Sequence, residues 1–114
     1  MTSCIFCKIA AGEIPSDQVY ADQDFVAFRD LQPQAPVHVL VIPRRHVGAL
    51  TEVTPGDADL LGRLQVTAAA VAAQLGLAAT GYRFVVNCGR DGCQIVPHLH
   101  LHLLGGRPLG WPPG

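Results

Sequence analysis

The stretch PHLHLHLLGG at residues 97–106 constrains this chain most, because three of its five histidines occupy alternate positions there. Successive side chains of a β-strand point to opposite faces, so His98, His100 and His102 share one face and the intervening leucines share the other. Neighbouring imidazoles on one face are about 6.6 Å apart, close enough for two of them to act on one small group. Histidine is neither a strong strand former nor a typical core residue, so the pattern indicates a functional site rather than a plain solvent-facing strand.

The rest of the chain predicts one main helix and several short strands. In the segment 54–77, Thr54 can cap a helix, Pro55 suits its first position, and apolar residues recur at helical spacing as far as Gly76. The apolar stretches FVAFRD, HVLVIP, YRFVVN and HLHLHLL predict strands, QVYAD predicts another, and CIFCKIAAGE predicts a short N-terminal helical turn. Glycine and proline exclude regular structure from the tail, residues 105–114. We therefore expect an α+β fold with a mostly antiparallel five-stranded sheet.

Length and composition limit the possible functions. The 114 residues suffice for one domain, which we expect to cover 1–114. A formal net charge of -1 gives no broad basic surface for nucleic acid. No apolar run approaches the ~20 residues of a membrane span, and the first residues do not resemble a signal peptide. We expect a soluble cytoplasmic protein without a nucleic-acid or membrane partner, whose four cysteines are thiols or metal ligands.

Two kinds of chemistry suit the histidine strand. A His-x-His pair can bind a metal, or the imidazoles can act as nucleophile and proton donor. No acidic residue follows Asp91 and no histidine follows His102, so a catalytic metal site made of this strand and a later carboxylate is disfavoured. A nucleophilic imidazole needs only a carbonyl that holds the hydrogen of its second nitrogen and a neighbouring histidine that serves the leaving group.

The segment CIFC places Cys4 and Cys7 at a spacing by which two thiolates bind zinc. A lone C-x-x-C is a weak signal, and two further ligands are needed. His46 and His98 are the histidines that would complete a structural Cys2His2 zinc site without using the expected nucleophile. The alternative is that both cysteines are simple thiols and that His46 is an ordinary residue at the end of a strand.

Three other regions allow both a structural and a functional interpretation. Asp30 follows a strand, where it could stabilise a turn or accept hydrogen bonds from a ribose. Asn87 and Gln94 flank the loop CGRDGC, which is either a hairpin turn or a backbone that approaches a ligand closely. Trp111 lies in a proline-rich tail, which suggests docking on a partner subunit.

Together these motifs resemble a known family. HLHLHLLGG fits the H-x-H-x-H-x-x pattern, with apolar x, of the histidine triad superfamily, and the chain closely resembles its histidine triad nucleotide-binding branch. The similarity covers essentially the full length, since segments such as CIFCKIAAGEIPS, LQPQAPVHVLVIPRRH, DGCQIVPHLHLHLLGGR and WPPG occur in the same order. A coincidence limited to three histidines would not extend to both flanks.

The resemblance implies an activity and an assembly. Such proteins hydrolyse nucleoside phosphoramidates and acyl nucleotides, typically purine derivatives of AMP such as adenosine 5′-phosphoramidate, without an organic cofactor. His100 matches the nucleophile that forms a nucleotidyl-histidine intermediate, His102 the histidine beside the scissile bond, and His38 the upstream histidine that supports the nucleophile. The implied assembly is a homodimer in which two sheets join and the WPPG tail reaches toward the partner's site.

The resemblance also implies binding residues. It places Asp30 at the ribose hydroxyls and both Asn87 and Gln94 near the phosphate, while the base pocket would contain Ile5, Phe6, Ile14, Phe28 and Leu31. Zinc-bearing bacterial members resemble the chain in Cys4, Cys7, His46 and His98. One departure is that Cys93 replaces a glycine and Ile95 replaces a hydroxyl-bearing residue, which leaves the preferred leaving group open.

Several alternative functions are left. Histidine rather than glutamine at position 102 favours hydrolysis over the transfer reaction of the uridylyltransferase branch, and the short chain with its WPPG ending disfavours the dinucleoside polyphosphate hydrolases. A nucleotide-binding regulator or scaffold with little turnover would keep the same pocket. A metal-binding protein would lose its function with the zinc.

Overall fold

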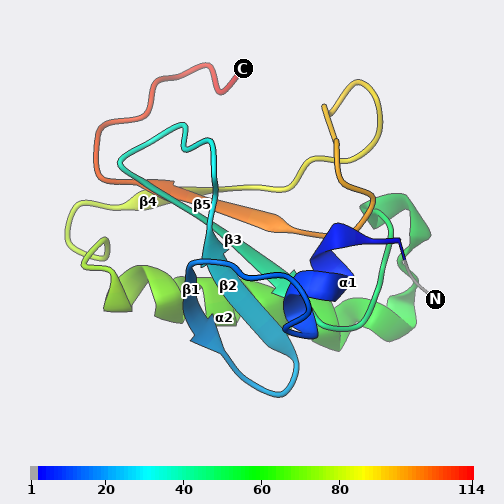
Figure 1. Ribbon diagram of the computed structural model, residues 1–114. Coiled ribbons are helices and arrows are strands. Elements are labelled where there is room, and N and C mark those ends of the chain that lie inside the picture. The colour runs from blue at the N-terminus through cyan, green and yellow to red at the C-terminus, as the bar shows by residue number, and fades with distance from the viewer. Residues whose placement is uncertain (1–2) are drawn as a thin grey trace.

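The computed structural model describes residues 3–114 (Figure 1). Its α-helices and strands, in chain order, are α1 (Ile5–Ala10), β1 (Gln18–Ala21), β2 (Phe25–Arg29), β3 (Val37–Pro43), α2 (Ala58–Gln74), β4 (Tyr82–Val85) and β5 (Leu101–Gly105). Two short 3-10 helices, η1 (Leu50–Glu52) and η2 (Pro55–Asp57), lie between β3 and α2. The strands form one sheet in the order β1-β2-β3-β5-β4, and every neighbouring pair is antiparallel. The predicted α+β class with five antiparallel strands and one main helix is confirmed.

The main helix begins later than its sequence pattern suggested. Pro55–Asp57 form a 3-10 turn, closed by a capping box in which the Thr54 amide donates to the Asp57 carboxylate at 2.9 Å. The α-helix α2 starts only at Ala58. The turn therefore satisfies amide groups that the first turn of a helix leaves without partners.

The two faces of the sheet pack against different helices. Leu99, Leu101 and Leu103 are 1%, 1% and 0% exposed and belong to the cluster that packs against α2. The opposite face contributes Val26, Phe28, Leu40 and Ile42, which pack against Phe6 and Ala10 of α1. Figure 1 shows the two helices on opposite sides of the sheet. The predicted alternation is confirmed, and the histidine face is covered by α1 instead of facing solvent.

The histidine segment is only partly a strand. β5 begins at Leu101, where it pairs with Val41 of β3, so His98 and His100 precede the ladder. The Leu99 amide instead donates to the Val47 carbonyl at 2.6 Å. The chain therefore stays extended through the triad, and its first two histidines lie beyond the paired part of the sheet.

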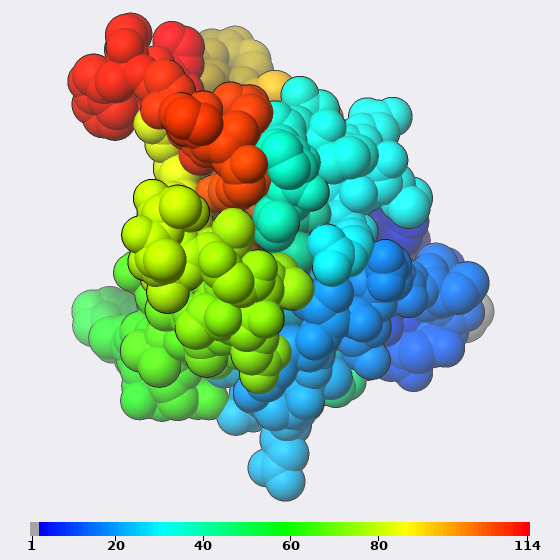
Figure 2. All heavy atoms as spheres, turned by 90° about the vertical axis from the view of Figure 1, so that its left-hand side faces the viewer, coloured from blue at the N-terminus to red at the C-terminus, as the bar shows by residue number. Residues whose placement is uncertain are grey.

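β5 includes Gly105, which pairs with Val37 and Tyr82, so the expectation that regular structure is excluded from the whole of 105–114 is wrong at this residue. The rest of the tail leaves the sheet and projects from the body of the molecule, in red in Figure 2. The Arg83 guanidinium lies 5.9 Å from the centre of the Trp111 ring and donates to the Gly110 carbonyl at 2.7 Å. Trp111 is nevertheless 81% exposed. The docking of this tail on a partner subunit stays a prediction. None of the described helices is long and apolar enough to cross a membrane.

Candidate functional site

A cavity of about 360 Å³ opens on the α1 side of the sheet. His100 and His102 reach it from the triad segment, and Cys93 and Ile95 line it from the loop before that segment. The predicted substrate-binding residues that line it are Ile5, Phe6, Ile14, Phe28, Asp30, Leu31 and Asn87. Most of these side chains are apolar, so the cavity suits a flat aromatic ligand with a polar group directed at the histidines.

The His100 ring is fixed by a backbone carbonyl. Its Nδ1 lies 2.7 Å from the carbonyl oxygen of His98. A carbonyl only accepts hydrogen bonds, so we assign the hydrogen to Nδ1 and the lone pair to Nε2. The ring is 6% exposed and meets the Phe6 ring edge-on, with centres 5.2 Å apart and an 86° angle between the planes. His100 thus has the tautomer and the restricted orientation that a nucleophilic imidazole requires.

A chain of hydrogen bonds sets the tautomer of His102. The Gln34 amide donates to His38 Nδ1 at 3.0 Å, which places the hydrogen of the neutral His38 ring on Nε2. His38 Nε2 lies 2.9 Å from His102 Nδ1, so it donates there and leaves the His102 hydrogen on Nε2. His38 therefore contacts His102, and its support of a nucleophilic His100, which the family resemblance implies, stays a prediction.

Burial keeps both of these rings neutral. Burial, the largest cause, acts together with the neighbouring His100 and His38 to lower the pKa of His102 to about 4. Burial also lowers the pKa of His38, although the Asp30 carboxylate, whose Oδ2 is 3.5 Å from His38 Nε2, acts in the opposite direction. At neutral pH, His102 is a neutral donor through Nε2.

The amide side chains of the loop before the triad have structural partners. Asn87 lines the cavity and donates to the Gly92 carbonyl at 2.6 Å. Gln94 is not among the lining residues, because its Nε2 donates to the Gly48 and Val96 carbonyls and its Oε1 accepts from the Gly89 amide. Gln94 holds the loop in shape, and its predicted contact with a phosphate would require these bonds to break.

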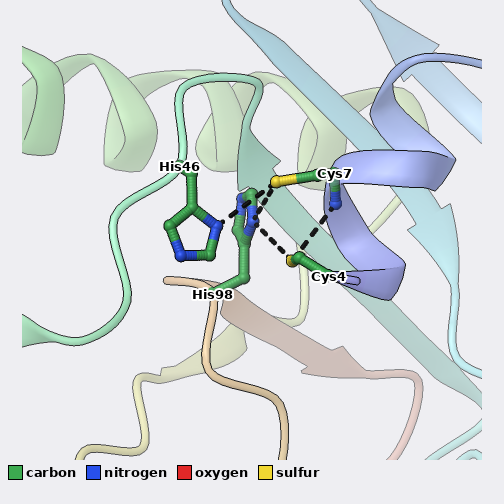
Figure 3. Close-up of side chains that lie close together, drawn as sticks. All are labelled: Cys4, Cys7, His46 and His98. Carbon is green, nitrogen blue, oxygen red and sulfur yellow. Dashed lines mark hydrogen bonds between the residues drawn. The ribbon is translucent and has the colours of Figure 1, made fainter. Parts of the chain in front are cut away.

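Cys4, Cys7, His46 and His98 converge in one cluster, as Figure 3 shows. The two cysteines come from the start of α1, His46 follows β3, and His98 precedes β5. His98 Nδ1 is 3.3 Å from the Cys4 sulfur and 3.5 Å from the Cys7 sulfur, and His46 Nδ1 is 3.3 Å from the Cys7 sulfur. The structure thus brings together all four residues that the sequence pattern selected.

The chemistry of this cluster fits zinc. With Zn–S near 2.3 Å and Zn–N near 2.0 Å, ligands on one tetrahedral ion would have sulfur and nitrogen about 3.5 Å apart, close to the spacings found. His98 Nε2 is 2.8 Å from the Pro43 carbonyl, so it carries the hydrogen and Nδ1 offers its lone pair to the sulfurs. Burial lowers the pKa of His98, which favours the neutral ligand form.

Asp30, His38 and His102 form the second group of potential ligands within residues 3–114. Their tautomers make them unsuitable for a metal. His38 Nε2 carries a hydrogen because the Gln34 amide occupies Nδ1, so the nitrogen that would have to bind the ion has no lone pair. This group transmits hydrogen bonds, and the Cys/His cluster is the one prepared for a metal.

The chain matches the family described as HIT domain over residues 11–109. It belongs to the HIT domain family. It is 50% identical over 106 residues to the purine nucleoside phosphoramidase of Escherichia coli (strain K12), covering 93% of this chain and 89% of that protein. It is 51% identical over 112 residues to the 14 kDa zinc-binding protein of Brassica juncea, with coverage of 96% and 98%. The HIT family hydrolase from Legionella pneumophila Philadelphia 1 superposes with a TM-score of 0.96 at 48% identity, covering 98% of this chain and 100% of that one.

The groups that complete this HIT site and that sequence reasoning missed are mostly in the backbone. The Gln34 amide and the Pro43 carbonyl set two of the histidine tautomers, and neither residue type predicts that role. Phe6 was expected in the base pocket, but its edge-on contact with His100 was not. A turn before β3 was visible in the sequence QPQAP, and it is the only signal that could have directed attention to Gln34.

Proposed function

We propose that this HIT protein hydrolyses purine nucleoside 5′-phosphoramidates and related acyl nucleotides through a covalent nucleotidyl-His100 intermediate. It is a nucleotide hydrolase of the HIT family, and the purine specificity and the intermediate are the proposed part. The observation that carries the proposal is the fixed tautomer of His100, whose Nε2 lone pair is available beside a largely apolar cavity. The similarity to a purine nucleoside phosphoramidase supports the substrate class.

In the first step, the Nε2 lone pair of His100 forms a bond to the α-phosphorus. The bond from phosphorus to the leaving nitrogen breaks, its electron pair stays on that nitrogen, and the nitrogen takes up the Nε2 proton of His102 and leaves as the amine. The Nε2–H of His102 is the hydrogen-bond donor placed for the leaving group, because Nδ1 of that ring accepts from His38. The His98 carbonyl accepts from Nδ1–H of His100 and so stabilises the positive charge that the ring gains on phosphorylation.

In the second step, a water oxygen attacks phosphorus from the side vacated by the amine. The water gives one proton to Nε2 of His102, the bond between phosphorus and His100 breaks, its electron pair returns to Nε2 of His100, and AMP leaves. Two displacements through an imidazole replace one direct attack of water on a stable phosphoramidate, so each barrier is lower. Asp30 lines the cavity with its carboxylate, where we place the ribose hydroxyls, and Phe6 and Phe28 would contact the base.

Zinc, when bound, would have a structural role. The four protein ligands Cys4, Cys7, His46 and His98 would fill its coordination positions and leave none for substrate. The named zinc-binding relative at 51% identity supports this assignment. We further propose a homodimer that receives the Trp111 tail, and a cytoplasmic location.

The test is hydrolysis of adenosine 5′-phosphoramidate by the wild type and by His100→Ala, with mass spectrometry of a His102→Asn variant after brief exposure to substrate. AMP release by the wild type and an acid-labile adduct of one nucleotidyl group on His100 are expected. If the wild type binds AMP but gives neither turnover nor adduct, the protein is a nucleotide-binding regulator. Faster cleavage of a dinucleoside polyphosphate than of the phosphoramidate would assign it to that class of hydrolase instead.

A further inference from the structure

The short helix α1 lies between the Cys/His cluster and the cavity. It has six residues, too few for a helix that is stable without tertiary contacts. Its first turn is held by Cys4, whose sulfur accepts from the Cys7 amide at 3.4 Å, and both sulfurs face His98. The position of α1 therefore depends on how firmly the cluster is held together.

The same helix forms a wall of the nucleotide cavity. Ile5, Phe6 and Ile9 line it. The Phe6 ring also meets the Phe28 ring edge-on, with centres 5.5 Å apart, and the His98 ring with centres 6.0 Å apart. Phe6 therefore contacts three groups: Phe28 of the cavity lining, the proposed nucleophile His100, and His98 of the Cys/His cluster.

His98 takes part in both sites. Its Nδ1 faces the two sulfurs, and its carbonyl oxygen accepts from His100 Nδ1 at 2.7 Å. It is 0% exposed and its ring is also held by the Pro43 carbonyl, so the side chain and the backbone of His98 have little room to move independently. A side chain that binds metal and a backbone that sets a tautomer thus belong to one rigid residue.

We propose that a zinc ion bound by Cys4, Cys7, His46 and His98 raises the affinity of the cavity for a nucleotide, and that Phe6 is the positioning residue that couples the two sites. Metal binding fixes α1 and the His98 backbone in the arrangement that the nucleotide needs, so the two ligands favour the same state of the protein. The inference rests on the proposed function only in taking a purine nucleotide as the ligand of the cavity.

Linkage gives a test that does not depend on turnover. The AMP dissociation constant is measured by calorimetry on zinc-loaded and chelator-treated protein, without free zinc and at a temperature where circular dichroism shows both forms folded. The zinc dissociation constant is measured by competition with a chromophoric chelator, with and without saturating AMP. We expect the same factor in both directions, about fivefold or more. A factor of one in the wild type overturns the inference.

Phe6→Leu separates coupling from simple loss of contact. This variant should weaken AMP binding, keep one zinc per chain and reduce the coupling factor toward one. Phe25→Leu is the matched control, because Phe25 is 1% exposed in the other core cluster, against α2. It should lose stability and keep the full coupling factor. Equal coupling in the two variants would exclude Phe6 as the coupling residue.

Cobalt gives a measurement that needs no metal-free protein. With Co²⁺ in the Cys/His cluster, AMP should shift the visible absorption bands of the ion in the wild type and in Phe25→Leu, and should leave them unchanged in Phe6→Leu. Coupling without phosphoramidate turnover would contradict the proposed hydrolysis and leave this inference intact. Turnover without coupling would contradict this inference alone, and failure to bind either zinc or AMP would also overturn it.

Discussion

His98 and His102 lie four residues apart in one extended segment, and their surroundings prepare them for opposite tasks. The Pro43 carbonyl holds the hydrogen of His98 on Nε2, which turns the lone pair of Nδ1 toward two sulfurs. His38 donates to Nδ1 of His102, which turns an N–H group toward the cavity. The same residue type thus becomes a metal ligand at one position and a hydrogen-bond donor at the other.

The difference shows that the acceptors and donors around a ring decide its chemistry. Both rings have a pKa lowered by burial, so neutrality alone does not separate them. The partner of the second ring nitrogen does, because a neutral imidazole has only one lone pair and one hydrogen to assign. Each prediction below alters one of the two sites and compares its effect with that of the other.

The largest expected difference between the sites is in catalysis. His100→Ala should lower kcat/KM for adenosine 5′-phosphoramidate by about 10³-fold or more, because no other group replaces the nucleophile. His46→Ala removes an outer zinc ligand and should lower kcat/KM by about tenfold, through weaker nucleotide binding. Steady-state kinetics on both variants measures the contrast. Equal losses would mean that the Cys/His cluster takes part directly in the reaction.

For the free energy of unfolding, in contrast to catalysis, the Cys/His cluster should contribute more than the site around His100. If zinc is present at 100 to 1,000 times its dissociation constant, chelation should lower the free energy of unfolding by about 3–4 kcal/mol. Cys7→Ser should show the same loss without chelation, whereas Cys88→Ser, which lies outside the cluster, should respond to the chelator like the wild type. Urea unfolding with and without chelator gives these values, and an unchanged midpoint would argue against a structural metal.

Acid should destabilise the protein through the catalytic site. The pKa of His102 is about 4 when folded and near its ordinary value of 6.5 when unfolded, so the unfolded chain takes up the proton first. This contribution is fully present above pH 6.5, and lowering the pH to 5 should reduce the free energy of unfolding by about 2 kcal/mol. His102→Gln should lack that part of the pH dependence. Urea titrations at pH 7 and 5 measure the free energy of unfolding of both proteins. An equal change between the two pH values in the wild type and in His102→Gln would contradict the prediction.

The amount that could be predicted from sequence also differed between the two sites. The Cys/His cluster is built from side chains at a recognisable spacing, so Cys4, Cys7, His46 and His98 were all identified, and the structure brings them within reach of one ion. The alternation of histidines and leucines likewise predicted the buried leucine face. These features could be predicted because residue types and the alternation of apolar and polar residues are visible directly in the sequence.

The hydrogen-bond chain could not be predicted in the same way. It depends on the amide of Gln34 and on the approach of His38 to His102 across two strands, which only the register of β3 on β5 determines. Gln94 illustrates the same limit, since its residue type did not indicate that its amide bonds to three backbone groups, while its contact with a phosphate stays a prediction. A backbone partner has no residue-type signature, so tautomers follow from the fold.

The smallest effect is expected at the end of the hydrogen-bond chain. Asp30→Asn keeps the shape of the side chain and removes the charge that lies 3.5 Å from His38 Nε2. Because the carboxylate raises the pKa of His38 and is proposed to bind the ribose, its loss should lower kcat/KM by about tenfold, close to 1.4 kcal/mol. Zinc affinity in the absence of nucleotide should not change, since Asp30 lies outside the Cys/His cluster. Comparing the affinities for AMP and 2′,3′-dideoxy-AMP separates a contact with the ribose hydroxyls from an influence on the His38–His102 pair. If Asp30 binds the ribose, the two ligands should bind the variant with nearly equal affinity. If the variant still binds AMP more tightly than the dideoxy ligand, Asp30 does not bind the ribose and acts through the His38–His102 pair.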